Sequence, residues 1–412
     1  MTLAHTTEPF VGACIPAPSL GVARLMRLIQ VEAELAVVWD GLLARLAADE
    51  GDAGALLDVS TLLQMSGQTE KGLELQAQAI ARQPYYRTVH GAGQGLRILA
   101  FMTPGDLMAN TPLDFLLEGS DAELILCYLD GRAPDPARLP AHDVAFLAVG
   151  QSDHGSDLLR SLEGAFDAWP VPVLNADAAL IADFSREGVA GRLAYAPGVL
   201  SPPAVRLDLG ELIQLALRAE AGQPRRADVA FPLIVRPVGS HAGRGLEKLT
   251  VPGDLIAYLA ERGEAEFYVS PFVDYSGADG LFRKLRVVFV AGRPYLSHLA
   301  VSEHWMVHYL NAGMAESPAK RAEEAAMFAS FDDDFCARHA VALRAVAERL
   351  PLDYFGIDCA ETKDGRLLVF EADVALIVHN IDPPDLYPYK PPAMTRLFAA
   401  VLEAFESRTQ AT

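Results

Sequence analysis

Three acidic residues near the end of the chain have the types and spacing to bind a metal ion. They lie in the segment DYFGIDCAETKDGRLLVFEAD, where Asp364-Gly365 between two apolar runs predicts a hairpin with a two-residue turn. That turn places Asp358 directly opposite Glu371, with Asp373 on the same face. Opposed carboxylates repel each other, and a divalent cation such as Mg²⁺ or Mn²⁺ would make them compatible. An exposed acidic face is the alternative interpretation.

A glycine-rich segment, FPLIVRPVGSHAGRG, has the composition of a phosphate-binding loop. An apolar strand ends at Arg236-Pro237, and the glycines that follow leave backbone N–H groups open to phosphate oxygens. Arginine guanidinium groups also suit phosphate. An ordinary turn between two strands is the alternative. His241 lies inside the loop and could meet either phosphate or substrate. The candidate phosphate-binding residues are Arg236, Gly239, Ser240, Gly243, Arg244 and Gly245.

Two cations two residues apart lie in the strand-like segment DGLFRKLRVVFVAGRPYLSHL. Strand alternation places Lys284 and Arg286 on one face, and Ala291-Gly292 predicts a tight turn after the strand. The two cations could face a reacting acyl phosphate, or they could face solvent. The segment after this hairpin contains polar side chains among aromatic ones, and its candidates for substrate contact are His298, His304, His308 and Asn311.

Three compositional zones must position these residues. Apolar residues recur near a helical period over residues 19–86, and a helix pair with a turn at Ser66-Gly67 is typical of one tetratricopeptide-type repeat. Residues 95–185 alternate strand and helix patterns, which predicts a small parallel sheet with strands at 96–102, 124–128, 144–149 and 171–174. Residues 186–405 mix hairpins with helices around 333–350 and 394–407, which favours an α+β arrangement.

Composition excludes several classes of function. The chain has 412 residues, 51% of them hydrophobic, and a formal net charge of −20. A chain this acidic is a poor binder of nucleic acid or of anionic membranes. It has no long apolar run and no basic, apolar leader, and its four cysteines are widely spaced. We therefore expect a cytoplasmic protein with free thiols that binds neither nucleic acid nor membrane.

Taken in order, these segments resemble the ATP-grasp superfamily, in particular its ligases of the glutathione-synthetase and ribosomal-S6-modification type. The resemblance covers residues 95–405 and implies an ATP-grasp fold. It implies that Arg236 and the glycine-rich loop cover the ATP phosphates, and that Arg286, with Lys284 and His241, serves catalysis. It also implies that Asp358, Glu371 and Asp373 bind Mg²⁺ or Mn²⁺. The implied adenine hinge and ribose contact comprise Ser270, Pro271, Phe272, Val273 and Asp274.

The sequence departs from the family pattern at three places. Arg236 replaces a lysine, Asp373 replaces an asparagine, and Ser270-Pro271 replaces the usual hinge glutamine or glutamate. The first departure keeps the positive charge, and the second adds a negative charge to the metal site. None of them removes an essential class of chemical group.

The resemblance implies three domains: a helical tetratricopeptide-like domain over 1–90, a pre-ATP-grasp α/β domain over 91–185, and a two-lobed ATP-grasp domain over 186–412. It implies an ATP-dependent carboxylate–amine ligase that forms an acyl phosphate and releases ADP and phosphate. The substrate could be a small molecule or a peptide, and the helical domain could pack on the chain or dock a partner. A homodimer is left open. The alternatives are a kinase of the same fold that phosphorylates a hydroxyl group, and a nucleotide-binding interaction module without turnover.

Overall fold

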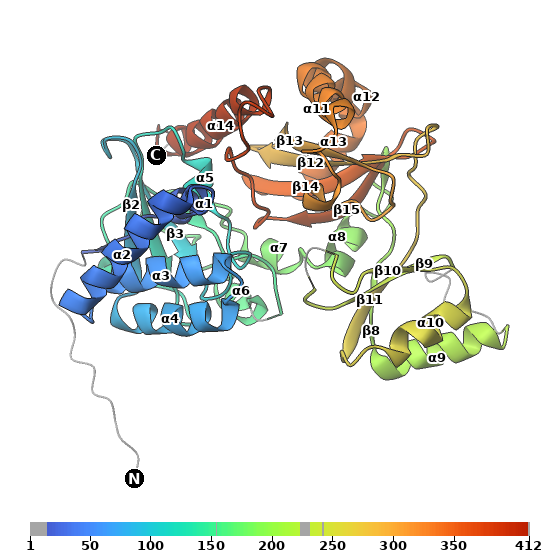
Figure 1. Cartoon of the computed structure of the whole chain (residues 1–412), viewed down its shortest axis with the longest axis horizontal. Coiled ribbons are helices and arrows are strands. Elements are labelled where there is room, and N and C mark those ends of the chain that lie inside the picture. The colour runs from blue at the N-terminus through green and yellow to red at the C-terminus, as the bar shows by residue number, and fades with distance from the viewer. Residues whose placement is uncertain (1–14, 154, 223–230, 241–242, 411–412) are drawn as a thin grey trace, which may run out of the picture.

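Three β-sheets and their helices form an α+β fold (Figure 1). The computed structural model describes residues 15–153, 155–222, 231–240 and 243–410. A largely parallel sheet comes first in the chain, and two largely antiparallel sheets follow it. The predicted fold class, α+β with a preceding small α/β unit, is therefore confirmed at this level. Within the described ranges, no helix is long and apolar enough to cross a membrane.

The first sheet has six strands in the order β1-β2-β4-β3-β5-β6. The four predicted parallel strands are present as β3 to β6, and the two-residue β1 and the five-residue β2 extend the sheet. Strands β1 and β2 lie within residues 1–90, so the sheet begins inside the segment predicted as helical. The strands are β1 (Ala17–Pro18), β2 (Tyr85–Val89), β3 (Arg97–Met102), β4 (Glu123–Tyr128), β5 (Val144–Leu147) and β6 (Val173–Leu174).

Four helices lie between β1 and β2: α1 (Val22–Ile29), α2 (Glu32–Ala48), α3 (Ala53–Met65) and α4 (Thr69–Arg82). The predicted helix pair corresponds to α3 and α4, and Gly67 in the connection has a φ of 81°. Leu57 of α3, Ala79 of α4 and Tyr86 of β2 share one buried cluster. The pair therefore packs on the sheet. Its assignment as a tetratricopeptide repeat, and any docking of a partner on it, stay predictions.

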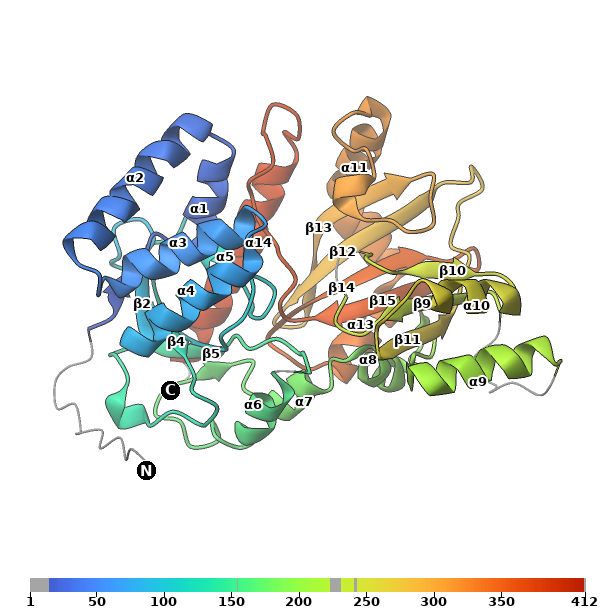
Figure 2. The ribbon, with the colours of Figure 1, turned by 60° about the horizontal axis from the view of Figure 1, so that its bottom comes forward.

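The second sheet is antiparallel throughout, in the order β10-β9-β11-β8. Helices α9 and α10 pack on it, and their apolar residues form one cluster with the strands. This small lobe lies apart from α1–α4 in both views (Figure 2). Its elements are β8 (Val205–Asp208), α9 (Leu209–Glu220), β9 (Leu233–Pro237), β10 (Glu247–Leu249), α10 (Pro252–Ala260) and β11 (Glu266–Pro271).

The third sheet has the order β13-β12-β14-β15-β7. Ala291 and Gly292 have φ values of 47° and 76° and join β12 to β13 in the predicted two-residue turn. The strands are β7 (Val199–Leu200), β12 (Phe282–Val290), β13 (Arg293–Ser302), β14 (Tyr354–Glu361) and β15 (Leu367–Asp373).

Helices on this third sheet differ in part from the prediction. The helix expected around 333–350 is divided, since a π-helical turn, η3 (Phe331–Phe335), and a break at His339 interrupt it. The closing helix is confirmed and longer than predicted. The helices are α11 (Pro318–Ser330), α12 (Cys336–Arg338), α13 (Ala340–Arg349) and α14 (Lys390–Gln410), with a 3₁₀ turn η2 (Tyr309–Asn311). The connecting elements upstream are α5 (Leu113–Leu116), η1 (Pro136–Arg138), α6 (Ser156–Ser161), α7 (Ala178–Ala182) and α8 (Arg186–Leu193).

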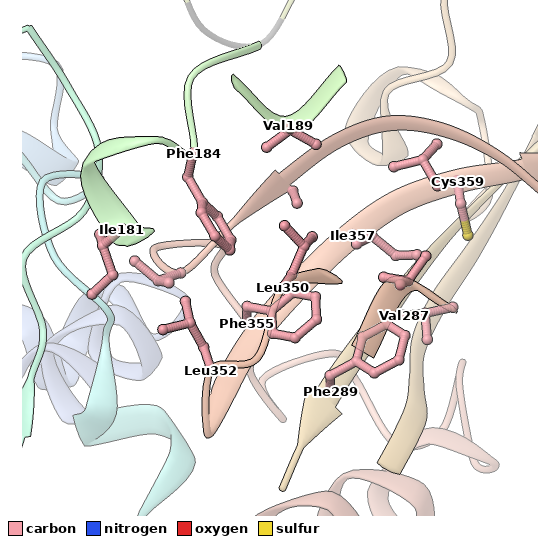
Figure 3. Packing of buried hydrophobic residues seen from close by; sticks show 14 of the residues in the cluster. Ile181, Phe184, Val189, Val287, Phe289, Leu350, Leu352, Phe355, Ile357 and Cys359 are labelled. Atoms are coloured by element: carbon pink, nitrogen blue, oxygen red, sulfur yellow. The ribbon is translucent and has the colours of Figure 1, made fainter. Parts of the chain in front are cut away.

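One face of the third sheet packs into an apolar core. Val287, Phe289, Phe355 and Ile357 point into one apolar core against α7 and α8 (Figure 3). Phe289 and Phe355 stack with ring centroids 4.7 Å apart. Because neighbouring residues of a strand point to opposite faces, this packing forces Arg286 and Asp358 onto the other face.

Candidate active site

A row of polar side chains crosses four strands of the third sheet. The register pairs His298 of β13 with Arg286 of β12, Arg286 with Asp358 of β14, and Asp358 with Glu371 of β15. Asp373 lies two residues beyond Glu371 on the same strand, opposite Gly356. The predicted pairing of Asp358 with Glu371 is therefore confirmed, and the basic strand belongs to the same site.

The hairpin reaches this register by a different route from the predicted one. Its turn has three residues rather than two, because Thr362 N–H donates to the Arg366 carbonyl at 3.0 Å and Gly365 takes a φ of 79°. That alone would shift the pairing by one residue. A bulge after Asp358 leaves Phe370 as the extra residue and restores the pairing. The two-residue turn is thus wrong, while the cross-strand pair derived from it is right.

Asp358 is held by two cations from β12. Its side chain is 1% exposed, and Lys284 Nζ donates to Oδ2 at 2.8 Å. Arg286 donates from Nε to Oδ1 at 2.8 Å and from Nη2 to Oδ2 at 3.2 Å. Burial alone would raise the pKa of Asp358, but the charges of Arg286 and Lys284 hold that pKa well below its usual range. Lys284 and Arg286 therefore face the acids, and the solvent-facing alternative for them is wrong.

Glu371 has a cationic partner that the sequence did not reveal. Arg186, at the start of α8, donates from Nη2 to Glu371 Oε2. Burial alone would raise the pKa of Glu371. The charge of Arg186 is the largest influence in the other direction, and the net result is a lowered pKa. Ser185 caps α8 by accepting from Gly188 N–H at 3.1 Å, which fixes the first turn that carries Arg186.

Asp373 is the acid of the group with the weakest compensation. It accepts one hydrogen bond, from Ala375 N–H at 2.9 Å. Burial, and then the charge of Glu371, raise its pKa to about 6. The least compensated negative charge of the site therefore lies at Asp373.

The expected metal set is not assembled in this conformation. Among the described residues, no three carboxylate, histidine or cysteine side chains are arranged to hold a metal ion. Lys284, Arg286 and Arg186 supply positive charge beside the three acids, so a divalent cation is not the sole way to make them compatible, and the metal assignment stays a prediction. Glu371 and Asp373 still offer hard oxygen ligands of the kind that Mg²⁺ takes, and both side chains are half-buried rather than sealed.

Substituting Asp373→Asn tests the charge balance at this position. Because the folded state raises the pKa of Asp373, ionisation of Asp373 opposes folding above pH 6, and its protonated form favours folding at low pH. We expect the variant to be more stable than the parent by roughly 2–3 kcal/mol at pH 7.5. The difference should shrink as the pH falls from 6 to 4. Denaturant unfolding at a series of pH values measures it, and a variant less stable at pH 7.5 would contradict the assignment.

The small lobe brings Arg236 to the same site. Arg236 donates from Nε to Ser240 Oγ at 3.2 Å, and its Nη2 donates to the Ser240 carbonyl. Burial, and then the nearby charge of Arg186, lower the pKa of Arg236 to about 10, and Arg236 in turn lowers the pKa of Glu371. The small lobe and the third sheet therefore meet around Arg186, Arg236 and Glu371.

The glycine-rich loop contacts the large lobe. Gly243 has a φ of 75°, a conformation that favours glycine, and a Cβ built there would lie 3.0 Å from the sulfur of the Met306 side chain. Gly239 and Gly245 also have positive φ values, and Tyr258 Oη donates to the Gly245 carbonyl at 2.7 Å. Arg244 is exposed. His241 lies outside the described residues, so its predicted role stays a prediction.

The predicted adenine hinge overlaps the end of β11, whose last two residues are Ser270 and Pro271. Phe272 N–H donates to the Pro232 carbonyl at 2.9 Å, and Lys248 Nζ lies 3.8 Å from the centroid of the Phe272 ring. Asp274, the predicted ribose contact, is engaged elsewhere. It accepts from Lys363 Nζ at 2.6 Å, and this bond is the main cause that lowers its pKa to about 2.

The predicted substrate histidines border the row of charges. Burial, and next the charge of Arg286, lower the pKa of His298 well below its usual value, and burial and Lys284 lower that of His308. The His298 ring packs against Tyr309 in a tilted arrangement, with ring centroids 4.7 Å apart. Because their pKa values are lowered, the imidazole rings of His298 and His308 are both neutral near pH 7. For His304 and Asn311, the described part of the chain records no contact with this row of polar side chains.

Sequence reasoning also missed the network behind His298. Lys390, at the start of α14, donates to Asp382 Oδ2 at 2.8 Å and to the Tyr309 hydroxyl. Glu324 of α11 is fully buried and accepts from Tyr389 Oη at 2.7 Å. In the sequence, Lys390 stands directly before two prolines, and nothing in that context predicts its place in this network.

Comparisons with known proteins give matches only among solved structures. No protein-family model matches the chain, and no curated protein matches it. A RimK domain protein ATP-grasp from Sphaerobacter thermophilus is 16% identical with a TM-score of 0.41, over 75% of this chain and 99% of that one. A D-alanine–D-alanine ligase from Bacillus anthracis complexed with ATP is 14% identical with a TM-score of 0.42, over 77% and 98%. The VanG D-Ala:D-Ser ligase from Enterococcus faecalis is 13% identical with a TM-score of 0.45, over 76% and 100%.

Proposed function

We propose that the chain is an ATP-dependent carboxylate–amine ligase of the ATP-grasp type. The observation that supports this most is the meeting of two antiparallel sheets around one charged site. The small sheet contributes Arg236 beside a glycine-rich loop, and the large sheet contributes Lys284 and Arg286 next to buried acids. This arrangement places fixed positive charge where the phosphates of a nucleotide would lie.

The proposed reaction follows from what these groups can stabilise. A substrate carboxylate oxygen attacks the γ-phosphorus of ATP, the bond to the β–γ bridging oxygen breaks, and ADP leaves. An amine then attacks the carbonyl carbon of the acyl phosphate, phosphate leaves with the bonding electrons, and the nitrogen loses a proton. Lys284 and Arg286 stabilise the negative charge that develops on the transferring phosphoryl group and on the tetrahedral intermediate.

Asp358 has a positioning role in this proposal. Both of its oxygens accept from Lys284 and Arg286, so the two cations are held on one face of β12 before any substrate arrives. Such preorganised charge needs no rearrangement during the reaction. Arg286 also donates from Nη1 to the Ile377 carbonyl at 3.1 Å, which fixes the guanidinium plane further.

The proposed metal ligands are Glu371 and Asp373. Mg²⁺ or Mn²⁺ held there would neutralise charge on the ATP phosphates when bound. Asp358 would join them only by releasing Lys284 or Arg286. The glycine-rich loop, with His241 inside it, is proposed to cover the phosphates and exclude water, since its Gly243 already approaches Met306 of the large lobe.

The test combines nucleotide binding with product analysis. Mg-ATP at about 100 times its Kd should stabilise the full chain by roughly 2.7 kcal/mol, and ATP with a chelator should stabilise it less. Arg236→Ala should lose the stabilisation, while Arg218→Ala, an exposed arginine on α9 of the same lobe, should keep it. A chain that no nucleotide stabilises would contradict the nucleotide site.

Products then separate the proposed reaction from its alternatives. A panel of carboxylates and amines is offered with Mg-ATP, and ADP and phosphate are measured. Equal amounts of ADP and phosphate that require both a carboxylate and an amine would support the ligase. ADP without free phosphate would indicate a kinase, and nucleotide binding with no ADP under any pair would favour the interaction module.

A further inference from the structure

His298 occupies one end of the polar row on the third sheet. It lies on β13, which begins the strand order of that sheet, and it pairs with Arg286 of β12. At the other end of the row, Glu371 bonds Arg186 and lies near Arg236 of the small lobe. Side chains directly opposite each other in a sheet have Cβ atoms about 4.5–5.5 Å apart. The His298 ring is therefore the next group beyond Arg286.

A β-bulge turns His298 to the polar face. Between the Arg286–His298 pair and the next pair of β12 with β13, Ser297 is an extra residue. Leu296 and Leu299, on either side, both enter the apolar core. In a regular strand His298 would share the face of Leu296, and the extra residue turns it to the opposite face. Bulges that re-aim a side chain in this way are over-represented next to active sites.

The nitrogen edge of the His298 ring is available to a ligand. His298 is half-buried. Among the described residues, no group forms a hydrogen bond with either ring nitrogen, and neither nitrogen is one of the polar atoms sealed from solvent. Because burial and the charge of Arg286 lower its pKa, the ring is neutral near pH 7, and a neutral imidazole has one nitrogen that accepts a proton. The neighbouring cations Lys284 and Arg286 have no such acceptor.

A buried polar network holds the ring in place. Tyr309, against which the His298 ring packs, donates to Glu324 Oε2 at 3.1 Å and accepts from Lys390 Nζ. Glu324 is fully buried, and its other oxygen accepts from the N–H of Leu299, the next residue after His298, at 3.0 Å. Buried charges are often no more stabilising than apolar residues in their place. A role in fixing β13 and the ring accounts for their presence here.

The order of groups along the row fixes the side from which an amine arrives. In the proposed reaction the ATP phosphates lie near Arg236 and Glu371, and the phosphoryl group is transferred beside Lys284 and Arg286. The attacking and leaving oxygens of such a transfer lie roughly in line with the phosphorus. ADP therefore leaves on the Glu371 side, and the substrate carboxylate lies on the His298 side. The carbonyl carbon that the amine must reach is next to His298.

We propose that His298 is a catalytic residue that accepts the proton of the amine nucleophile. The inference rests on the proposed ligase function and deepens it, because it names the group that serves the second step. The neutral ring nitrogen accepts a hydrogen bond from the amine N–H. As the nitrogen–carbon bond forms, the bond from the carbonyl carbon to the phosphate oxygen breaks, and phosphate leaves with that electron pair. The proton passes from the amine nitrogen to the ring nitrogen and then to water.

Trapping the acyl phosphate separates the two steps of the reaction. The full chain receives Mg-ATP, the best carboxylate and either its amine partner or hydroxylamine, which is largely uncharged at pH 7 and needs no base. His298→Phe keeps an aromatic ring against Tyr309 but has no nitrogen. We expect it to lower amide formation about 100-fold or more, the effect of a missing general base, and to keep hydroxamate formation within about three-fold of the parent. Arg293→Gln, exposed at the start of the same strand, is the matched control and should keep both rates.

A second variant guards against an effect of the substitution on folding. His298→Gln keeps a neutral, hydrogen-bonding side chain that cannot take up the proton, and it should give the same split as His298→Phe. Parallel losses of amide and hydroxamate in both variants would make the role of His298 structural and overturn the proposal, and so would amide formation at the parental rate. These outcomes are separable from failure of the ligase. A parent that forms hydroxamate from no carboxylate, or amide with no amine, would reject the proposed reaction and the role of His298 with it.

Discussion

Arg286→Ala is expected to lower the rate of ADP formation by about 10²–10³-fold, the loss typical of removing one donor that stabilises transition-state charge. Arg286 donates both to Asp358 and to the Ile377 carbonyl in the segment after β15. Its removal takes away positive charge at the proposed phosphoryl site and loosens the Ile377 carbonyl. We therefore expect the loss mainly in kcat rather than in the KM for ATP.

Steady-state ADP release with the best substrate pair measures this effect. Arg283→Ala is the matched control, since Arg283 lies on the same strand but pairs with Asp279 and Glu323 near the surface. Arg286→Lys keeps the charge without the planar, forked donor set and should recover only part of the rate. A rate for Arg286→Ala within three-fold of the control would refute the catalytic role.

Predictions from the sequence were most accurate where they rested on neighbouring residues, such as strand alternation and turn dipeptides. Alternation in β12 correctly placed Lys284 and Arg286 on one face, because Leu285 between them enters the core. The turn at Ala291-Gly292 followed from its glycine, which adopts positive φ readily, whereas Ala291 takes a φ of 47° that alanine rarely adopts. Long-range partners have no such signal. Arg186 is 185 residues from Glu371 in the chain, and only the packing of α8 near β15 brings them together.

The hairpin that carries the acids shows how a correct pair can follow from an incomplete argument. Asp-Gly favours a two-residue turn, but Thr362 competes by bonding across it, with its Oγ1 accepting from Arg366 N–H at 2.9 Å. A three-residue loop results, and the bulge at Phe370 compensates. Phe370 and Tyr275 pack with ring centroids 5.0 Å apart, and this tertiary contact is invisible in the local sequence. A bulge stabilised by tertiary packing cannot be predicted from strand alternation.

A similar limit applies to the expected role of the acids. Three carboxylates on one face indicate that positive charge must be present, but they do not identify its source. A metal ion was one solution, and the chain supplies a second with Lys284, Arg286 and Arg186. The small β1 and β2 were missed for a related reason. A two-residue strand such as β1 has no periodicity of its own, and it exists because a sheet edge is available beside it.

Asp358→Asn is expected to destabilise the fold by about 3–5 kcal/mol at pH 7, because it leaves two buried cations without their shared carboxylate. The sign of the pH dependence follows from the lowered pKa of Asp358. A carboxylate whose folded pKa is depressed contributes stability above its unfolded pKa, and that contribution is lost as the pH falls through the folded value. The difference between parent and variant should therefore be constant from pH 6 to 8 and shrink only in strong acid.

Denaturant unfolding from pH 3 to 8 measures this difference, with Asp364→Asn at the exposed hairpin turn as the control. A second variant separates the cost of unpaired cations from the value of the ion network. Replacing Lys284 and Arg286 by methionine and Asp358 by leucine removes all three charges together, and buried ionic groups replaced in this way are often neutral or stabilising. We expect this triple variant to be more stable than Asp358→Asn and devoid of ADP formation. That combination would mean that the charges are present for catalysis and that the fold does not require them, whereas a triple variant less stable than Asp358→Asn would make the network structural.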